Sequence, residues 1–125
     1  MSTDRLVYLD HNATTRIAPE VVESMLPCLT DYWGNPSSAY SLAIKPARLI
    51  EEARECVARL IGSENRSIVF TSCGTESNNA AIQGAIIANP TKRHIVSTAV
   101  EHSANIKFFQ HLENRGFEVT LLPVD

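Results

Sequence analysis

The sequence is short of the features that mark several classes of protein. Its 125 residues hold only three cysteines, Cys28, Cys56 and Cys73, and none belongs to a CxxC pair. That scarcity argues against a disulfide framework or a zinc site. No apolar run approaches the roughly 18 residues of a membrane span, and the first residues carry no signal-peptide pattern. The net charge of −3 comes without a basic stripe. We therefore expect a single cytoplasmic domain that binds neither membrane nor nucleic acid.

Two further kinds of motif are missing. Neither a GxxxxGK[ST] sequence nor a GxGxxG fingerprint occurs, which counts against a nucleotide-binding α/β domain. Three of the four histidines, His94, His102 and His111, are eight and nine residues apart, and this spacing fits no compact metal-ligand motif. We therefore expect no resident metal ion.

The residues that are present form an α/β pattern in the second half of the chain. Short β-branched and apolar runs at 68–71, 94–98 and 117–122 predict strands. Between these runs, apolar residues recur with the spacing of a helix. One set is Ile82, Ala85 and Ile86, and the other is Ile106, Phe109 and Leu112. Successive β-α-β units with short connections predict three parallel strands with crossover helices.

Two helices are predicted before this α/β pattern, within residues 16–62. Pro19 suits the first position of a helix, and Pro27 inside the same helix predicts a kink or a break. The second helix is predicted to end at Gly62, because glycine readily adopts the left-handed conformation of a helix stop. The predicted buried stripes are Val22, Met25, Leu26 and Leu29, then Ile50, Ala53, Val57, Leu60 and Ile61. The predicted solvated ion pairs are Arg48 with Glu52 and Glu55 with Arg59.

The turn after the first predicted strand contains a candidate anion site at Gly74 and Thr75. The turn opens a helix, where backbone N–H groups are unpaired and the helix dipole is positive. An ordinary turn capped by Thr75 is the alternative. Glu101 and His102 follow the second predicted strand. Because parallel strands end at one sheet edge, we expect both turns to face one crevice.

Two other places carry polar or reactive side chains. Residues 10–15 are a cluster of turn-forming residues, for which a loop capped by its own side chains is the simplest interpretation. Cys73 precedes a predicted helix, whose N-terminus lowers a thiol pKa and could make it reactive. A passive small residue is the alternative for Cys73.

Four blocks of sequence occur together in one order. They are YLDHNATT at 8–15, GNPSS at 34–38, FTSCGTESNN at 70–79 and TAVEH at 98–102. Together they resemble the N-terminal third of the cysteine desulfurases, class V aminotransferase relatives with the fold of type I pyridoxal-phosphate enzymes. The resemblance covers essentially the whole chain. It implies an arm with an active-site loop at 1–15, a helical segment at 16–62 and a β-α-β-α-β part of the large domain at 67–125, with the C-terminal remainder absent.

The resemblance also implies roles for the turns. Gly74 and Thr75 would bind the phosphate of pyridoxal 5′-phosphate through backbone N–H groups and the threonine hydroxyl. His102 would stack on the pyridine ring, and a surface histidine that caps a helix is the alternative. Asn12 is the loop residue expected nearest the substrate. The Schiff-base lysine and the sulfur-accepting cysteine of the family have no counterpart among these 125 residues, so we expect no catalytic residue here.

The complete enzyme would remove sulfur from L-cysteine and leave alanine and an enzyme persulfide. That persulfide would supply iron–sulfur cluster assembly or another acceptor, and the resemblance implies a homodimer for the full-length form. A second class of function is a non-enzymatic binding or assembly module that docks on a full-length relative. Taken alone, the 125-residue chain is expected to lack the activity of the family.

Overall fold

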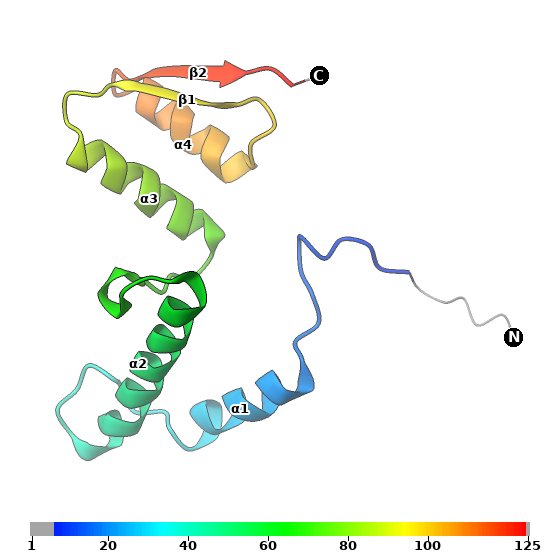
Figure 1. Ribbon diagram of the computed structural model, residues 1–125, viewed down its shortest axis with the longest axis vertical. Helices are drawn as coiled ribbons and strands as arrows, with labels where there is room; N and C mark the ends of the chain where they lie inside the picture. Colours follow the sequence, from blue (N-terminus) through cyan, green and yellow to red (C-terminus); the bar gives the residue numbers. More distant parts are fainter. Residues whose placement is uncertain (1–6, 125) are drawn as a thin grey trace, which may run out of the picture. The chain divides into compact units, whose positions relative to one another are not determined.

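The structure, a computed structural model, describes residues 7–124. Residues 1–6, where the predicted arm begins, and residue 125 lie outside the described residues. The chain divides into two compact units, Met1–Ile68 (unit 1) and Val69–Asp125 (unit 2). The elements are α1 (Pro19–Thr30), α2 (Ser41–Ile61), the 3-10 helix η1 (Asn65–Ser67), α3 (Gly74–Ala88), β1 (His94–Thr98), α4 (Ser103–Glu113) and β2 (Glu118–Leu122) (Figure 1). None of the helices within residues 7–124 is long and apolar enough to cross a membrane.

Helix α1 begins where the sequence predicts but does not break where it predicts. Pro19 stands at the start of the helix, where its missing N–H costs nothing. The helix continues through Pro27 to Thr30. The backbone N–H groups of Asp31 and Tyr32 both donate to the Pro27 carbonyl at 2.9 Å, which holds the last turn closed. The helix therefore does not break at Pro27, because the missing N–H removes one bond of the ladder while the turn that follows keeps its own. The kink that the sequence allowed there stays a prediction.

Helix α2 ends at Gly62 as predicted, with a φ of 67° and the cap N–H directed at the Ala58 and Arg59 carbonyls. The apolar stripes predicted for the two helices are largely exposed, however. Helix α1 has no buried residue, and Leu60 of α2 is 84% exposed. The buried residues of α2 are Ala43, Pro46 and Ala58. A stripe is buried only where a second element covers it, and the principal partner of α2 among the described residues of unit 1 is the short η1.

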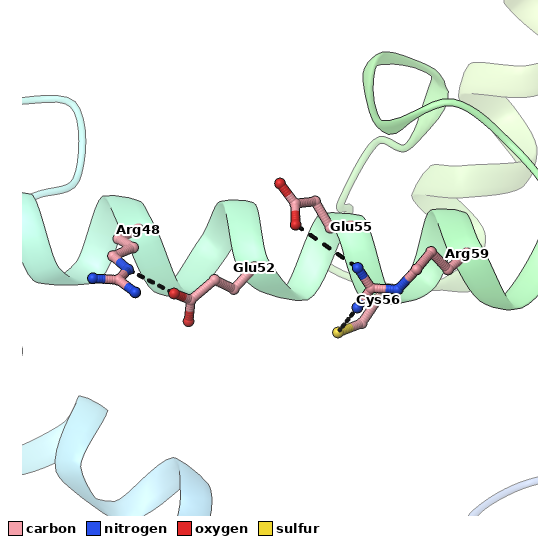
Figure 2. A network of polar contacts seen from close by, with 5 residues as sticks. All are labelled: Arg48, Glu52, Glu55, Cys56 and Arg59. Carbon is pink, nitrogen blue, oxygen red and sulfur yellow. Dashed lines mark hydrogen bonds and ion pairs between the residues drawn. The ribbon is translucent and has the colours of Figure 1, made fainter.

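Charged side chains on the outer side of α2 form the predicted ion pairs (Figure 2). The Arg48 Nε lies 2.6 Å from Glu52 Oε1, and the Arg59 Nη1 lies 3.9 Å from Glu55 Oε2. A second nitrogen of Arg59 donates to the Cys56 sulfur at 3.1 Å. These side chains are exposed, so the pairs contribute little to stability.

Gly34 packs closely against the backbone of α2. A Cβ atom at this position would lie 2.3 Å from the Leu42 carbonyl oxygen, so no larger residue fits without moving backbone. The contact seats the loop between α1 and α2 on the first turn of α2. Next to it, Ala43 is only 1% exposed. The Lys45 ammonium lies 5.6 Å from the centre of the Tyr32 ring.

Unit 2 is built around a parallel pair of strands. Strands β1 and β2 pair from His94 opposite Glu118 to Thr98 opposite Leu122, and α4 is the crossover between them. Figure 1 shows the strands side by side with α4 along them. Phe109 and Leu112 of α4 are 5% and 1% exposed, so the predicted apolar face of this helix forms the core of the unit.

The first predicted strand, at residues 68–71, does not form. The sheet of the described residues has two strands, β1 and β2. The Ile68 carbonyl accepts instead from the Arg54 guanidinium, and Val69 and Phe70 are 78% and 50% exposed. A strand needs a neighbour for its N–H and C=O groups, and a run of β-forming residues cannot supply one. The α/β class with parallel strands is confirmed, whereas the count of three strands is wrong for the described residues.

Candidate functional site

The start of α3 is arranged differently from the cap that the sequence suggested. Cys73 stands at the N-cap position, and Gly74 and Thr75 are the first two helical residues. The first intrahelical bond runs from the Ser77 N–H to the Cys73 carbonyl at 3.1 Å. Thr75 therefore does not cap the helix. The N–H groups of the preceding helical residues have no intrahelical acceptor.

The Cys73 thiol reports the electrostatic character of this turn. The backbone N–H of Glu76, followed by the Ser72 hydroxyl and the Thr75 N–H, lowers the pKa of this exposed thiol. The two backbone N–H groups donate hydrogen bonds that favour the thiolate. The start of α3 therefore stabilises negative charge, as the anion-site prediction requires.

Glu76 holds the residue before the cap in place. Its Oε2 accepts from the Ser72 N–H at 2.7 Å and from the Ser72 hydroxyl at 2.6 Å. These two bonds, the hydroxyl first, lower the pKa of the Glu76 carboxyl. A glutamate that reaches back from the first helical turn is related to a capping box. The position of Glu76 three residues after Cys73 was a sequence signal for this arrangement.

Gly74 leaves room beside the turn. A Cβ atom built on this residue would meet nothing within 4 Å. Both Gly74 and Thr75 are exposed, so a ligand can approach the backbone and the Thr75 hydroxyl from solvent. The structure thus places the two residues at an open helix start, which is the surrounding that a phosphate group needs.

His102 is the N-cap residue of α4. Its Nδ1 accepts a hydrogen bond from the Ala104 N–H at 3.2 Å. A nitrogen that accepts carries no proton, so the neutral ring is protonated at Nε2. The ring is exposed, and Nε2 has no hydrogen-bond partner within residues 7–124. This is the surface helix-cap role that the sequence offered as the alternative to stacking on a pyridine ring.

A chain of hydrogen bonds links β1, α4 and α3. Glu101 accepts from the Ser97 hydroxyl at 3.1 Å and from the Asn105 amide at 2.7 Å. The Asn78 amide of α3 donates to the Asn105 carbonyl oxygen at 3.2 Å. Asn105 and then Ser97 lower the pKa of the Glu101 carboxyl by donating to its charged form. We call these four residues the amide network.

The amide network lies at one end of a hollow of about 340 Å³ in unit 2. Its polar lining is the network itself, and its apolar lining consists of Ala81, Ile82, Ile95, Val96 and Phe109. Gly74, Thr75 and His102 are not among the lining residues. Of the residues predicted to face one crevice, only Glu101 lines this hollow, so the hollow is not the predicted crevice between the two turns.

The network nevertheless brings the two helix starts together. Figure 1 shows α3 and α4 side by side with their first turns at the same end of the pair. The bond between Asn78 and Asn105 joins them there. Gly74 and Thr75 begin one helix of this pair, and His102 caps the other. Their assignment to a cofactor stays a prediction.

Asn12 lies in unit 1, in a loop that Tyr8 organises. The Tyr8 hydroxyl lies 2.8 Å from the Asp10 carbonyl and 3.0 Å from the Thr14 carbonyl. The Ala13 N–H donates to the Asp10 carbonyl at 3.1 Å, which leaves Asn12 exposed within the turn. The His11 Nδ1 also lies 3.3 Å from the Thr15 hydroxyl, so polar side chains of the loop interact as the sequence suggested. The tyrosine that precedes the loop adds the contacts that span it. The proposed substrate role of Asn12 stays a prediction.

Asn78 and Asn105 were missed by the sequence analysis. They are 27 residues apart on different helices. Each by itself is an ordinary polar residue of the kind found on solvated helix surfaces. No local pattern indicates that two amides on separate helices will meet. Glu101 was named only as part of a turn, although a carboxylate four residues before an asparagine on a helix start could have suggested a pairing.

The fold agrees with comparisons to known proteins. A family model described as aminotransferase class-V matches residues 7–125, and the chain belongs to this family. Within it, the cysteine desulfurase of Trichormus azollae is 51% identical over 120 residues, which are 96% of this chain and 30% of that protein. Among solved structures, a NifS-like protein aligns with a TM-score of 0.86 at 39% identity and covers 95% of this chain and 33% of its own.

A third similar protein has been described with a ligand. The structure described as SspA in complex with cysteine has a TM-score of 0.84 and 39% identity, and it covers 92% of this chain and 33% of its own. The chain spans about 30% of the length of the curated relatives that it matches. These likenesses favour the enzyme family over a non-enzymatic docking module.

Proposed function

We propose that this chain is the cofactor-phosphate-binding part of a pyridoxal-phosphate-dependent cysteine desulfurase. The proposal rests mainly on the start of α3. There, backbone N–H groups of Glu76 and Thr75 lower the pKa of the Cys73 thiol, and the space beside Gly74 is open. A turn that stabilises one anion offers the same N–H groups to a phosphate.

The residues of unit 2 fit a phosphorylated pyridine ring in chemical type. Gly74 and Thr75 would hold the phosphate with backbone N–H groups and one hydroxyl, and the exposed His102 ring would lie against the pyridine. Pyridoxal phosphate supplies an electron sink for chemistry at the α-carbon of an amino acid. The part played by this chain is to bind and orient that group. The hydrogen bond that the Ala104 N–H donates to Nδ1 holds the His102 ring in one tautomer.

L-Cysteine is the proposed substrate of the complete enzyme. The similarity to SspA, whose structure is described in complex with cysteine, supports this choice. Sulfur would then pass to an acceptor, and the proposed acceptor is an iron–sulfur scaffold protein. Asn12 is proposed to lie near the substrate. The homodimer, the iron–sulfur acceptor and the cytoplasmic location rest on the family resemblance alone.

Titration of the 125-residue chain with pyridoxamine 5′-phosphate tests the proposal. This form of the cofactor has no aldehyde and cannot form imines with Lys45, Lys92 or Lys107, so its fluorescence reports binding by the turn. We expect saturable binding that is much weaker with pyridoxamine, which lacks the phosphate. ATP, added as a competitor, should displace little of the ligand.

Equal binding of pyridoxamine with and without its phosphate would contradict the phosphate assignment. Preferential displacement by ATP would instead support a nucleotide site. Inorganic phosphate provides the matched control, because a true phosphate cradle is also occupied by the free anion at higher concentration.

A further inference from the structure

Asn105 occupies a special place in unit 2 because both ends of its amide are used. Its Nδ2 donates to Glu101 at 2.7 Å, and its Oδ1 accepts from Asn78 at 3.2 Å. The two bonds fix which way the amide points, since an inverted amide would face a donor with a donor and a carboxylate with an oxygen. Asn105 and Glu101 are half-buried, so solvent replaces these bonds only partly.

The two partners of Asn105 belong to different parts of the candidate site. Glu101 immediately precedes His102, and it is anchored to β1 through Ser97. Asn78 lies in the second turn of α3, the helix that begins with Gly74 and Thr75. Asn105 itself is in the first turn of α4, directly after the His102 cap. One amide therefore connects the strand end, the histidine turn and the helix of the phosphate turn.

We infer that Asn105 is a positioning residue that holds the His102 turn and the start of α3 at a fixed separation for one ligand. The inference rests on the proposed function for the identity of that ligand. A phosphorylated pyridine is rigid, so a ring site and a phosphate site serve it together only if their distance is set in advance. Asn105 touches neither end of the ligand and acts through its partners.

An exchange of charge within the network tests this role. In the single variant Asn105→Asp, a second carboxylate faces Glu101, and their repulsion opens the contact. In the double variant Glu101→Gln/Asn105→Asp, the new amide donates to the new carboxylate. The other oxygen of that carboxylate accepts from Asn78, and the amide oxygen at position 101 accepts from Ser97. All three hydrogen bonds are then restored with the donor and acceptor exchanged.

Two measurements at pH 7.5 report the result on the 125-residue chain. The Kd for pyridoxamine 5′-phosphate is expected to rise about tenfold or more in Asn105→Asp, as for coupled residues in one network, and to return close to the starting value in the double variant. Nuclear Overhauser contacts between the first two turns of α3 and α4, measured without ligand, should be lost in the single variant and recovered in the double variant.

Two control variants separate positioning from general effects. Gln110→Glu adds the same charge to the same helix away from the network, and it should leave the Kd and the contacts unchanged. Leu112→Val weakens the core of unit 2, where Leu112 is 1% exposed, without touching the network. Measured well below its unfolding temperature, it should also keep the Kd, which shows that lower stability alone does not weaken binding.

Helix contacts that persist in Asn105→Asp, or a double variant that fails to recover them, would overturn the inference. A tenfold higher Kd in Leu112→Val would also overturn it, because the loss of affinity in Asn105→Asp could then be caused by lower stability alone. If the unaltered chain does not bind the phosphate ligand, the proposed function fails. The loss and recovery of the helix contacts still decide the positioning role in that case.

Discussion

Two side chains of the candidate site also interact with the first turn of a helix. His102 caps α4 through Nδ1, and the Cys73 sulfur accepts from the first N–H groups of α3. In each case a helix end uses a group that the ligand would also use. Substitutions at such residues change stability and binding together, so the two effects have to be separated by the choice of replacement.

Replacing Thr75 with valine is expected to weaken phosphate binding. Valine keeps the shape of threonine but removes the hydroxyl, and a hydrogen bond to a charged group contributes about 1.5–3 kcal/mol. The Kd for pyridoxamine 5′-phosphate should therefore rise about tenfold to a hundredfold. Thr75→Ser keeps the hydroxyl and serves as the control. An unchanged Kd in Thr75→Val would count decisively against a phosphate contact at this residue.

The capping and ring-stacking roles of His102 can be separated with two substitutions. His102→Ala removes both, and loss of an N-cap should lower the free energy of unfolding by about 0.5–2 kcal/mol. His102→Asn supplies a side chain that caps helices well but has no ring, so stability should be retained while binding of pyridoxamine 5′-phosphate weakens. Chemical denaturation and fluorescence titration measure the two quantities.

Unchanged ligand affinity in His102→Asn would show that the ring does not stack on the ligand. Unchanged stability in His102→Ala would show that the cap contributes nothing. The two outcomes are independent, so each role is tested separately.

At the scale of an element, the start of α3 depends on the charge of Glu76. Its carboxylate accepts hydrogen bonds from both the N–H and the hydroxyl of Ser72. These bonds reach their full strength only when the carboxyl group is ionised. The helix start is thus linked to pH through one exposed side chain. The first turn of α4 has a similar dependence on Glu101.

The pKa of Glu76 is lowered in the folded chain, and this fixes the direction of its pH effect. A group with a depressed folded pKa contributes stability above its unfolded pKa, about 4.3 for glutamate, and loses that contribution as the pH falls through the folded value. Thermal unfolding measured from pH 7 to pH 3 should therefore show a smaller decrease in Glu76→Gln than in the unaltered chain. Gln110→Glu on α4 is the control for a change of charge. Parallel pH curves for the unaltered chain and Glu76→Gln would refute the assignment.

The elements that the sequence predicted correctly are those whose signals are local. Gly62 ends α2, His94–Thr98 forms β1, and Phe109 and Leu112 are buried as their spacing predicted. Residues 68–71 have the composition of a strand but no strand beside them, and Leu60 has the spacing of a core residue but is 84% exposed. Burial and strand pairing depend on partners, which local composition does not contain.

The same distinction applies to the candidate site. Gly74 and Thr75 could be placed at a helix start because the apolar spacing after them is local, and the structure finds them there. The bond between Asn78 and Asn105 could not be predicted, since it depends on how two helices pack. The cap observed at Cys73 lies two residues before Thr75, the cap that the sequence suggested. Helix boundaries commonly vary by one or two residues.

At the scale of the whole molecule, the chain leaves many large apolar side chains in solvent. Among them are Leu29 at 72%, Val96 at 57% and Leu122 at 49% exposure. They lie on α1, β1 and β2, so both units contribute. Exposed apolar side chains and open strand edges favour contacts with other molecules.

We expect the isolated 125-residue chain to be of low stability or to self-associate at micromolar concentration. Sedimentation velocity and thermal unfolding measure this directly. Leu29→Lys should reduce association if α1 carries it, and Val96→Lys should do so if the strands carry it, because each places a charge on an apolar surface. A monomer with one sharp two-state transition would contradict the expectation.

The chain alone is expected to release no sulfide or alanine from L-cysteine above the rate of free pyridoxal phosphate in buffer. Desulfuration requires a base for the α-proton and a thiolate that attacks the substrate sulfur, and the family residues for these steps have no counterpart in this sequence. Cys73 is the thiol to test, since its pKa is lowered and it is exposed. Turnover well above background that disappears in Cys73→Ser would reveal a minimal desulfurase that uses a different cysteine.

The parallel register of unit 2 has a consequence for synthesis on the ribosome. His94 pairs with Glu118 and Thr98 with Leu122, so β1 emerges before any residue of β2 exists. At about 5–20 residues per second, the wait for β2 is on the order of seconds, whereas α4 can form within about a microsecond. During that interval α3 and α4, which line one hollow together with Ile95, are the elements that can cover this side chain. A substitution that slows the formation of α4 would therefore lower the yield of soluble protein by more than its effect on the free energy of unfolding predicts.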